Sequence, residues 1–125
     1  MAMHTLNLIP PGNYLACIVN VQSIMQSSSL EFYGAFTRFT LSIESGPARG
    51  RLIVKHIQTY DNNENKIEEG IAELSKITEL LGASANNKSM IGKMVCAKIR
   101  NKNVFQDVFI NNVEEICKID ECDKI

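Results

Sequence analysis

The stretch ESGPARGRLIVKH, residues 44–56, places four basic or titratable side chains beside one predicted turn. Two glycines and a proline are enough to make such a turn, so the turn by itself does not account for Arg49, Arg51, Lys55 and His56. Guanidinium groups bind phosphate oxygens through paired hydrogen bonds, and the glycine between the two arginines lets a ligand come close to the backbone. The stretch therefore indicates contacts to a phosphate backbone. Solvated charges on a plain hairpin are the alternative, and His56 is more typical of an ordinary strand residue than of a ligand.

Cations and aromatic residues recur in the neighbouring segments. In AFTRFTLSIES, residues 35–45, Phe36 and Arg38 share one face of a predicted strand, so one could stack on a base while the other meets a phosphate. In IGKMVCAKIR, residues 91–100, two cations alternate with apolar residues and a third follows in the next turn. We expect the following residues to bind single-stranded DNA: Phe36, Arg38, Arg49, Arg51, Lys55, Tyr33, Lys98, Arg100 and Lys102. Further candidates for stacking are Phe32, Tyr60 and Phe105. The alternative is that Phe36 packs in the core and the cations are solvated.

The apolar pattern predicts five strands and one helix in the order β-β-β-α-β-β. Alternation in the second strand points Thr37, Phe39, Leu41 and Ile43 to the core. The third strand, in residues 49–60, can be read in either phase, with Leu52 and Val54 inward or outward. Helical spacing appears over residues 67–81, with Gly82 as a stop and Asn63 or Asp61 as a cap. This order is that of a mainly β, five-stranded OB-fold-like Greek-key barrel with one helix. An α+β sandwich could share the order.

The 125 residues suffice for one domain, expected over 1–113 and followed by an acidic tail at 114–125. The formal net charge is −1, yet residues 64–82 and the tail each contain five acidic residues against two lysines. The remaining strands and turns are therefore basic, which can define a binding face. None of the four cysteines forms a CxxC pair, so we expect reduced thiols, with Cys17 and Cys96 as small core residues. The sequence shows no secretory signal or membrane span.

Several segments together resemble a known family: LIPPGNY, FTRFTLSIESGPARGRLIV, IAELSKITELLGA and MIGKMVCAKI. They are similar to a phage-encoded family of small proteins, long labelled only as a domain of unknown function. The resemblance covers roughly residues 8–113. It implies an OB-fold protein that binds single-stranded DNA in phage replication or recombination. Two departures affect the expected DNA path: the connection MQSSSLEFYG lacks basic residues and contains Glu31, and the last strand carries Asp107.

The sequence therefore predicts a non-enzymatic, sequence-independent single-stranded DNA-binding protein of the bacterial host cytoplasm. We expect no cofactor, no metal and no membrane partner, since no nucleophile–base pair, metal cluster or phosphate loop is found. The acidic tail could recruit replication or recombination proteins; the alternative interpretation is a short helix or a frayed chain end. The sequence does not determine whether the protein forms a homodimer. The alternative is an OB-fold protein-interaction module that docks on a replication, recombination or host-defence protein. A small nuclease or nucleotide-processing enzyme is a third hypothesis.

Overall fold

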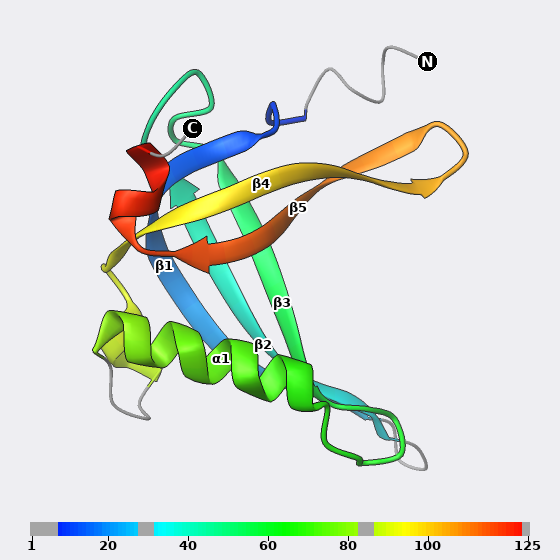
Figure 1. Ribbon diagram of the computed structural model, residues 1–125. Coiled ribbons are helices and arrows are strands. Elements are labelled where there is room, and N and C mark those ends of the chain that lie inside the picture. Colours follow the sequence, from blue (N-terminus) through cyan, green and yellow to red (C-terminus); the bar gives the residue numbers. More distant parts are fainter. Residues whose placement is uncertain (1–7, 28–31, 83–86, 124–125) are drawn as a thin grey trace.

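The structure is a computed structural model that describes residues 8–27, 32–82 and 87–123. Five strands, one α-helix and two short 3-10 helices follow one another (Figure 1), namely β1 (Gly12–Ser27), β2 (Phe32–Ile43), β3 (Leu52–Tyr60), α1 (Glu68–Leu81), η2 (Asn87–Met90), β4 (Met94–Phe105), β5 (Val108–Cys117) and η3 (Ile119–Asp123). The predicted order of strands and helix is confirmed. Within the described residues, no helix has both the length and the apolar character that crossing a membrane would require.

All five strands lie in one antiparallel sheet with the order β3-β2-β1-β4-β5. The long strand β1 serves both halves of this sheet, because its residues 12–17 pair with β4 whereas its residues 16–27 pair with β2. The sheet therefore folds over along β1, and β4 and β5 cross in front of the other three strands (Figure 1). The sheet is not closed into a barrel by hydrogen bonding, since β3 and β5 remain its two edges.

The hydrophobic core lies between the two halves of the folded sheet. In β2 the predicted inward set is buried, as are Val95, Ala97 and Ile99 of β4. In β1 a bulge between Ile18 and Asn20 reverses the alternation, so the buried face passes from Ile18 to Val21. An extra residue in one strand has this effect because side chains alternate with a period of two.

In β3 Leu52 and Val54 face outward, which is one of the two phases that the sequence allowed. Ile53 and Ile57 are buried, whereas Leu52 is 64% exposed and Val54 is 41% exposed. The sequence allowed both phases because apolar residues occur on both faces of this strand. The choice is made by β2, whose register sets Ile53 opposite Leu41 on the core side. His56 consequently points outward, next to Arg38.

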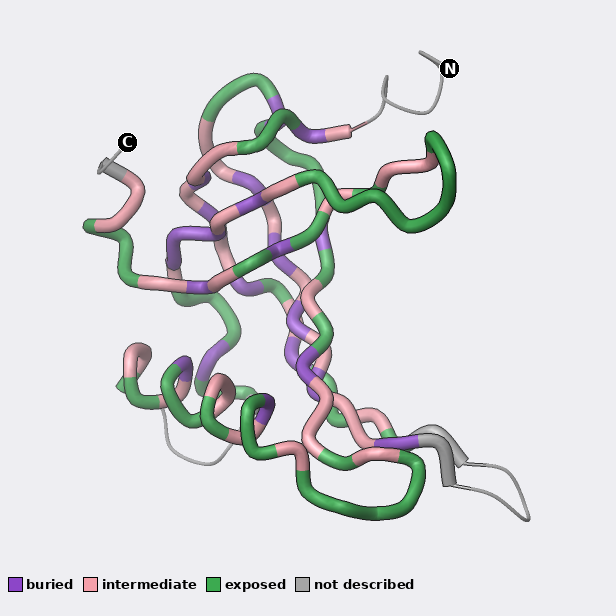
Figure 2. The backbone as a smooth tube through the Cα atoms, turned by 45° about the vertical axis from the view of Figure 1, so that its right-hand side comes forward, coloured by how far each residue is buried: buried purple, intermediate pink, exposed green. Residues whose placement is uncertain are grey.

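The helix α1 lies against β3 and covers one open side of the core (Figure 2). It begins after Ile67 without a side-chain cap, so the predicted cap at Asn63 or Asp61 is wrong. The Asp61 carboxylate instead accepts hydrogen bonds from the main chain of the preceding turn. The predicted stop is confirmed, since Gly82 has a φ of 62°. Gly70 lies directly over the Gln58 carbonyl of β3, where an added Cβ would overlap that group.

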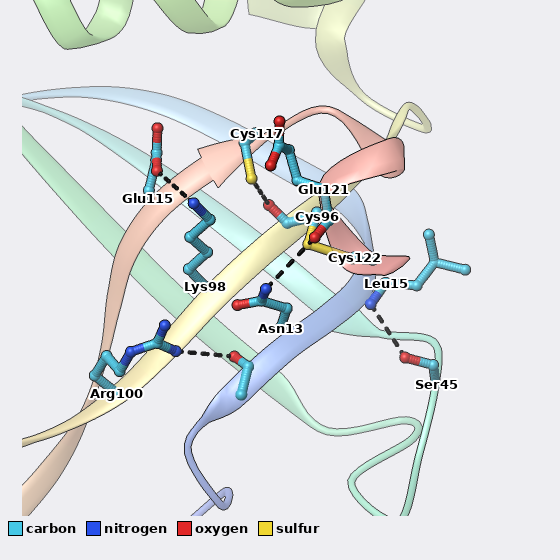
Figure 3. The surroundings of a disulfide bond; sticks show 11 residues. Asn13, Leu15, Ser45, Cys96, Lys98, Arg100, Glu115, Cys117, Glu121 and Cys122 are labelled. Carbon is cyan, nitrogen blue, oxygen red and sulfur yellow. Dashed lines mark hydrogen bonds and ion pairs between the residues drawn. A yellow bond between two sulfur atoms is a disulfide. The ribbon is translucent and has the colours of Figure 1, made fainter. Parts of the chain in front are cut away.

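The C-terminal segment is part of the folded unit as far as it is described. Strand β5 extends to Cys117, and η3 then packs on the outer face of β4 (Figure 3), held by a disulfide between Cys96 and Cys122. The expectation that all four thiols are reduced is therefore wrong for this pair. Cys96 is fully buried as predicted, but its side chain points away from the main core and toward η3. The boundary expected at residue 113 also differs, because residues 114–117 belong to β5.

Candidate nucleic-acid interface

The outer face of β1, β2 and β3 carries a row of polar and aromatic side chains in cross-strand register. Gln22, Arg38 and His56 form one row across the three strands, because Arg38 is the register partner of both other residues. Phe36 lies in the next row, opposite Gln58. The side chains of these rows point away from the core, since their neighbours Thr37 and Phe39 in sequence are buried.

His56 contacts both Arg38 and Phe36 on this outer face. The Nε atom of Arg38 donates a hydrogen bond to Nε2 of His56 over 2.9 Å, so the ring must be unprotonated at that nitrogen. The rings of Phe36 and His56 meet edge to face, with centroids 6.4 Å apart. Burial, followed by the positive charge of Arg38, lowers the pKa of His56 from its ordinary value. The hydrogen bond from Nε to the ring thereby holds the guanidinium in place on this face.

The same face continues toward the turn between β2 and β3. Leu52 and Val54 stand beside Ser42 and Thr40 of β2 and are exposed. The turn is closed by a hydrogen bond of 2.7 Å from the Gly50 nitrogen to the Ile43 oxygen, and Gly50 has a φ of 89°. This left-handed conformation favours glycine and brings the exposed arginines of the turn to the end of β3.

The side chains on this outer face form what we call the β2–β3 strip: Phe36, Arg38, Thr40, Ser42, Leu52, Val54 and His56. Arg49 and Arg51 are exposed in the turn at one end of the strip. From Leu52 to Gln58, the register partner of Phe36, the strip is about 20 Å long at a rise of about 3.3 Å per residue. It has an aromatic ring and a cation at one end, two arginines at the other and apolar side chains between them. Two of the predicted DNA-binding residues, Phe36 and Arg38, lie in this strip, and two more, Arg49 and Arg51, lie in the turn at its end.

Lys55 does not lie in the strip, because it shares the inward phase of β3 with Ile53 and Ile57. Its side chain is only 11% exposed, and its ammonium group lies 3.0 Å from a carboxylate oxygen of Glu73 in α1. It also donates a hydrogen bond to the main-chain oxygen of Val113 over 2.8 Å. Lys55 is thus engaged in joining elements of the fold, and we leave it out of the candidate interface.

Lys98 and Arg100 lie on the outer face of β4, on the other side of the core from the strip. The Lys98 ammonium group is 3.1 Å from a carboxylate oxygen of Glu115 (Figure 3). The Nε atom of Arg100 is 3.6 Å from a carboxylate oxygen of Glu114. The carboxylate of Glu115 raises the pKa of Lys98, and Lys98 in turn lowers the pKa of Glu115. A bulge in β5 brings the two adjacent glutamates to these cations. The sequence analysis missed this pairing because a bulge leaves no clear signal in a single sequence.

Two predicted residues lie elsewhere. Lys102 belongs to the exposed hairpin formed by the far ends of β4 and β5, together with Phe105. Tyr33 is in β2, but its side chain and that of Phe32 lie outside the described part of the structure. The predicted residues are therefore not brought together in one site. Those with described side chains lie on the outer face of β2 and β3 or in the turn beside it, on the outer face of β4, inside the fold and in the β4–β5 hairpin.

A hollow of about 440 Å³ lies between α1 and β5, away from the strip. Its lining includes four carboxylates and one lysine: Glu69, Glu73, Glu114, Glu115 and Lys76. Such a lining repels phosphate, and Glu73, Glu114 and Glu115 already have cationic partners. This hollow is therefore not a candidate for binding nucleic acid.

Fold and face together define a mainly β protein with one five-stranded antiparallel sheet, one helix and an exposed, partly basic outer face. No protein-family model matches the chain, and no curated protein matches its sequence. The resemblance described from the sequence motifs therefore stays a prediction.

Proposed function

We propose that this protein binds single-stranded DNA along the β2–β3 strip without reading its sequence. The observation that carries the proposal is that His56 joins Arg38 and Phe36 on the outer face of the sheet, through a hydrogen bond to the first and a ring contact with the second. Single-strand binding of this kind needs aromatic surfaces for bases and cations for phosphates. Phe36 supplies the former and Arg38 the latter, while Arg49 and Arg51 supply further cations at the opposite end of the strip.

The position of the strip within the fold supports the same proposal. An OB-fold presents the outer face of its second and third strands, and the strip lies on β2 and β3. We propose that this sheet is an OB-fold-like barrel in which the Lys55 side chain bridges β3 and β5 in place of a hydrogen-bond ladder. The motifs that resemble the phage family support a role in phage or prophage replication or recombination, in the cytoplasm of a bacterial host.

The proposal is tested by fluorescence anisotropy with a labelled oligo-dT of about 30 nucleotides, which exceeds the site size of a single OB-fold. Each salt-sensitive phosphate contact contributes about 0.7 to the slope of log affinity against log salt on a single strand. We expect Arg38→Ala to reduce this slope by about that amount. Phe36→Ala should weaken binding by about 1–3 kcal/mol, which is about 5-fold to 150-fold.

The matched control is Arg100→Ala, which removes the same charge from the opposite face of the molecule. We expect it to change the affinity less than Arg38→Ala does, because Arg100 is already paired with Glu114. If Arg100→Ala weakens binding and Arg38→Ala does not, the interface is on β4 and the strip is not the site. If the wild-type protein does not bind at low salt, the DNA-binding proposal is wrong.

A protein-interaction module is the second candidate, and one observation favours it. The middle of the strip is apolar, with Leu52 and Val54 both exposed. Such a surface suits a protein partner, for instance a replication, recombination or host-defence protein. In that case Leu52→Ser would abolish partner binding, and raising the salt concentration would have little effect on it.

A further inference from the structure

The far ends of β4 and β5 form a two-stranded ribbon that leaves the rest of the sheet. β1 pairs with β4 only as far as Ile99, and beyond this point β4 pairs with β5 alone. We call this ribbon the β4–β5 arm; it comprises residues 100–105 and 108–112. It projects away from the rest of the sheet in Figure 1, and Figure 2 shows most of its length as exposed.

The arm exposes large apolar side chains. Phe105 is 65% exposed, Val104 is 49% exposed and Ile110 is 46% exposed. A ribbon of two strands is only marginally stable in water, and stability normally requires a third strand or a packed face. The arm thus has the character of a surface that is completed by another chain.

The two edges of the arm differ in charge. The β4 edge carries Arg100 and Lys102, and charged side chains of this kind protect an edge strand from pairing with another strand. The β5 edge reads VFINN over residues 108–112 and contains no charged residue, proline or glycine. Among the described residues no strand pairs with β5 on this side. The free edge ends at Val113, whose main-chain oxygen accepts the hydrogen bond from Lys55.

We propose that the β5 edge pairs antiparallel with the same edge of a second copy of this chain, with Ile110 on the two-fold axis. The five residues that lack a described strand partner on this edge are centred on Ile110, so this register sets Ile110 against itself, Phe109 against Asn111 and Val108 against Asn112. The Asn111 side chain already binds the Ile9 main chain, so the pairing uses the backbone of Asn111 and not its amide group. No like charges meet across this pairing, whereas pairing of two β4 edges would bring the cations of both copies together. A two-fold pairing uses the same patch on both copies and closes after two subunits, so it gives a dimer rather than a fibre.

The dimer leaves the β2–β3 strip uncovered, because the strip lies on β2 and β3 and not on the arm. The inference therefore does not depend on DNA binding and is tested without DNA. Sedimentation velocity should show the mass rising with concentration from 14.0 kDa toward twice that value. A wild-type protein that stays monomeric up to high micromolar concentration overturns the proposal.

Two variants of equal charge locate the interface. Ile110→Lys should weaken the dimer by about tenfold or more, because two ammonium groups would meet at the axis. Val104→Lys adds the same charge to an equally exposed position on β4 and should leave the dimer intact. If Val104→Lys dissociates the dimer and Ile110→Lys does not, the copies meet through β4 and the proposal is wrong.

A covalent measurement tests the register and does not depend on how the lysine variants fold. Ile110→Cys places two thiols opposite each other at the axis, so mild oxidation should give a disulfide-linked dimer rapidly. Val104→Cys is the control, and its linkage should be much slower. Equal rates of linkage for the two variants would overturn the proposed register.

Discussion

The ammonium group of Lys55 in β3 donates a hydrogen bond of 2.8 Å to the main-chain oxygen of Val113 in β5. These two strands are the edges of the sheet, and no ladder of backbone hydrogen bonds joins them. The same ammonium group is 3.0 Å from the Glu73 carboxylate of α1. One largely buried cation therefore links both edges of the sheet to the helix that covers the core.

Replacing Lys55 tests this link. Lys55→Met keeps the length of the side chain and removes its charge, which leaves the Val113 oxygen and the Glu73 carboxylate without this partner. We expect the free energy of unfolding to fall by about 2 kcal/mol, since hydrogen bonds to charged groups contribute about 1.5–3 kcal/mol. Urea unfolding measures the change, with Lys102→Met on the exposed arm as the control. Equal stability of both variants would show that the bridge contributes nothing.

The contact between Arg38 and His56 predicts the titration of the imidazole. Burial and the Arg38 charge lower the pKa of His56, so the folded protein takes up this proton at a lower pH than the unfolded chain, whose value is about 6.5. Stability should therefore decrease slightly as the pH falls below about 6.5. An NMR titration should show the pKa of His56 rising in Arg38→Ala. Oligo-dT should also raise it, because a nearby phosphate favours the charged ring; an unchanged value with DNA bound argues against the strip.

Gly70 predicts an exception to helix propensity. Alanine normally favours a helix over glycine by about 1 kcal/mol. Here an added Cβ would overlap the Gln58 carbonyl, so α1 would have to move away from β3. We expect Gly70→Ala to destabilise the protein by about 1–3 kcal/mol, as for overpacked core positions. Thermal unfolding measures this, and Ser75→Ala on the exposed side of α1 is the control. A stabilised Gly70→Ala protein would contradict the close contact.

The disulfide predicts a large effect of reduction. Cys96 and Cys122 are 26 residues apart, and closing a loop of this size stabilises a fold by about 3 kcal/mol. Cys122→Ser should lose about that amount and become insensitive to reducing agent. Cys17→Ser, which removes a half-buried free thiol, is the control. Peptide mapping of the unreduced protein checks the pairing directly, and a linkage through Cys117 instead would contradict it.

Much of the fold follows from local patterns in the sequence. The alternation in β2 identifies Phe39 and Leu41 as core residues because a strand with one buried face must alternate. The period change at residues 67–81 and the left-handed glycine at position 82 define α1 for similar local reasons. The same alternation placed Phe36 and Arg38 together on the outer face, and the predicted pair is the part of the candidate interface that the structure retains.

The remaining features depend on contacts between segments that are distant in sequence. The sequence is compatible with both phases of β3, and the register with β2 selects one of them. In this phase Lys55 points inward and His56 points outward. Lys98 and Arg100 look like free cations in the sequence, but a bulge in β5 supplies Glu115 and Glu114 to pair with them. The sequence determined which side chains alternate, because that depends on neighbouring residues. Only the tertiary structure decided which face each set occupies, because strand register and folding of the sheet along β1 are set by long-range packing.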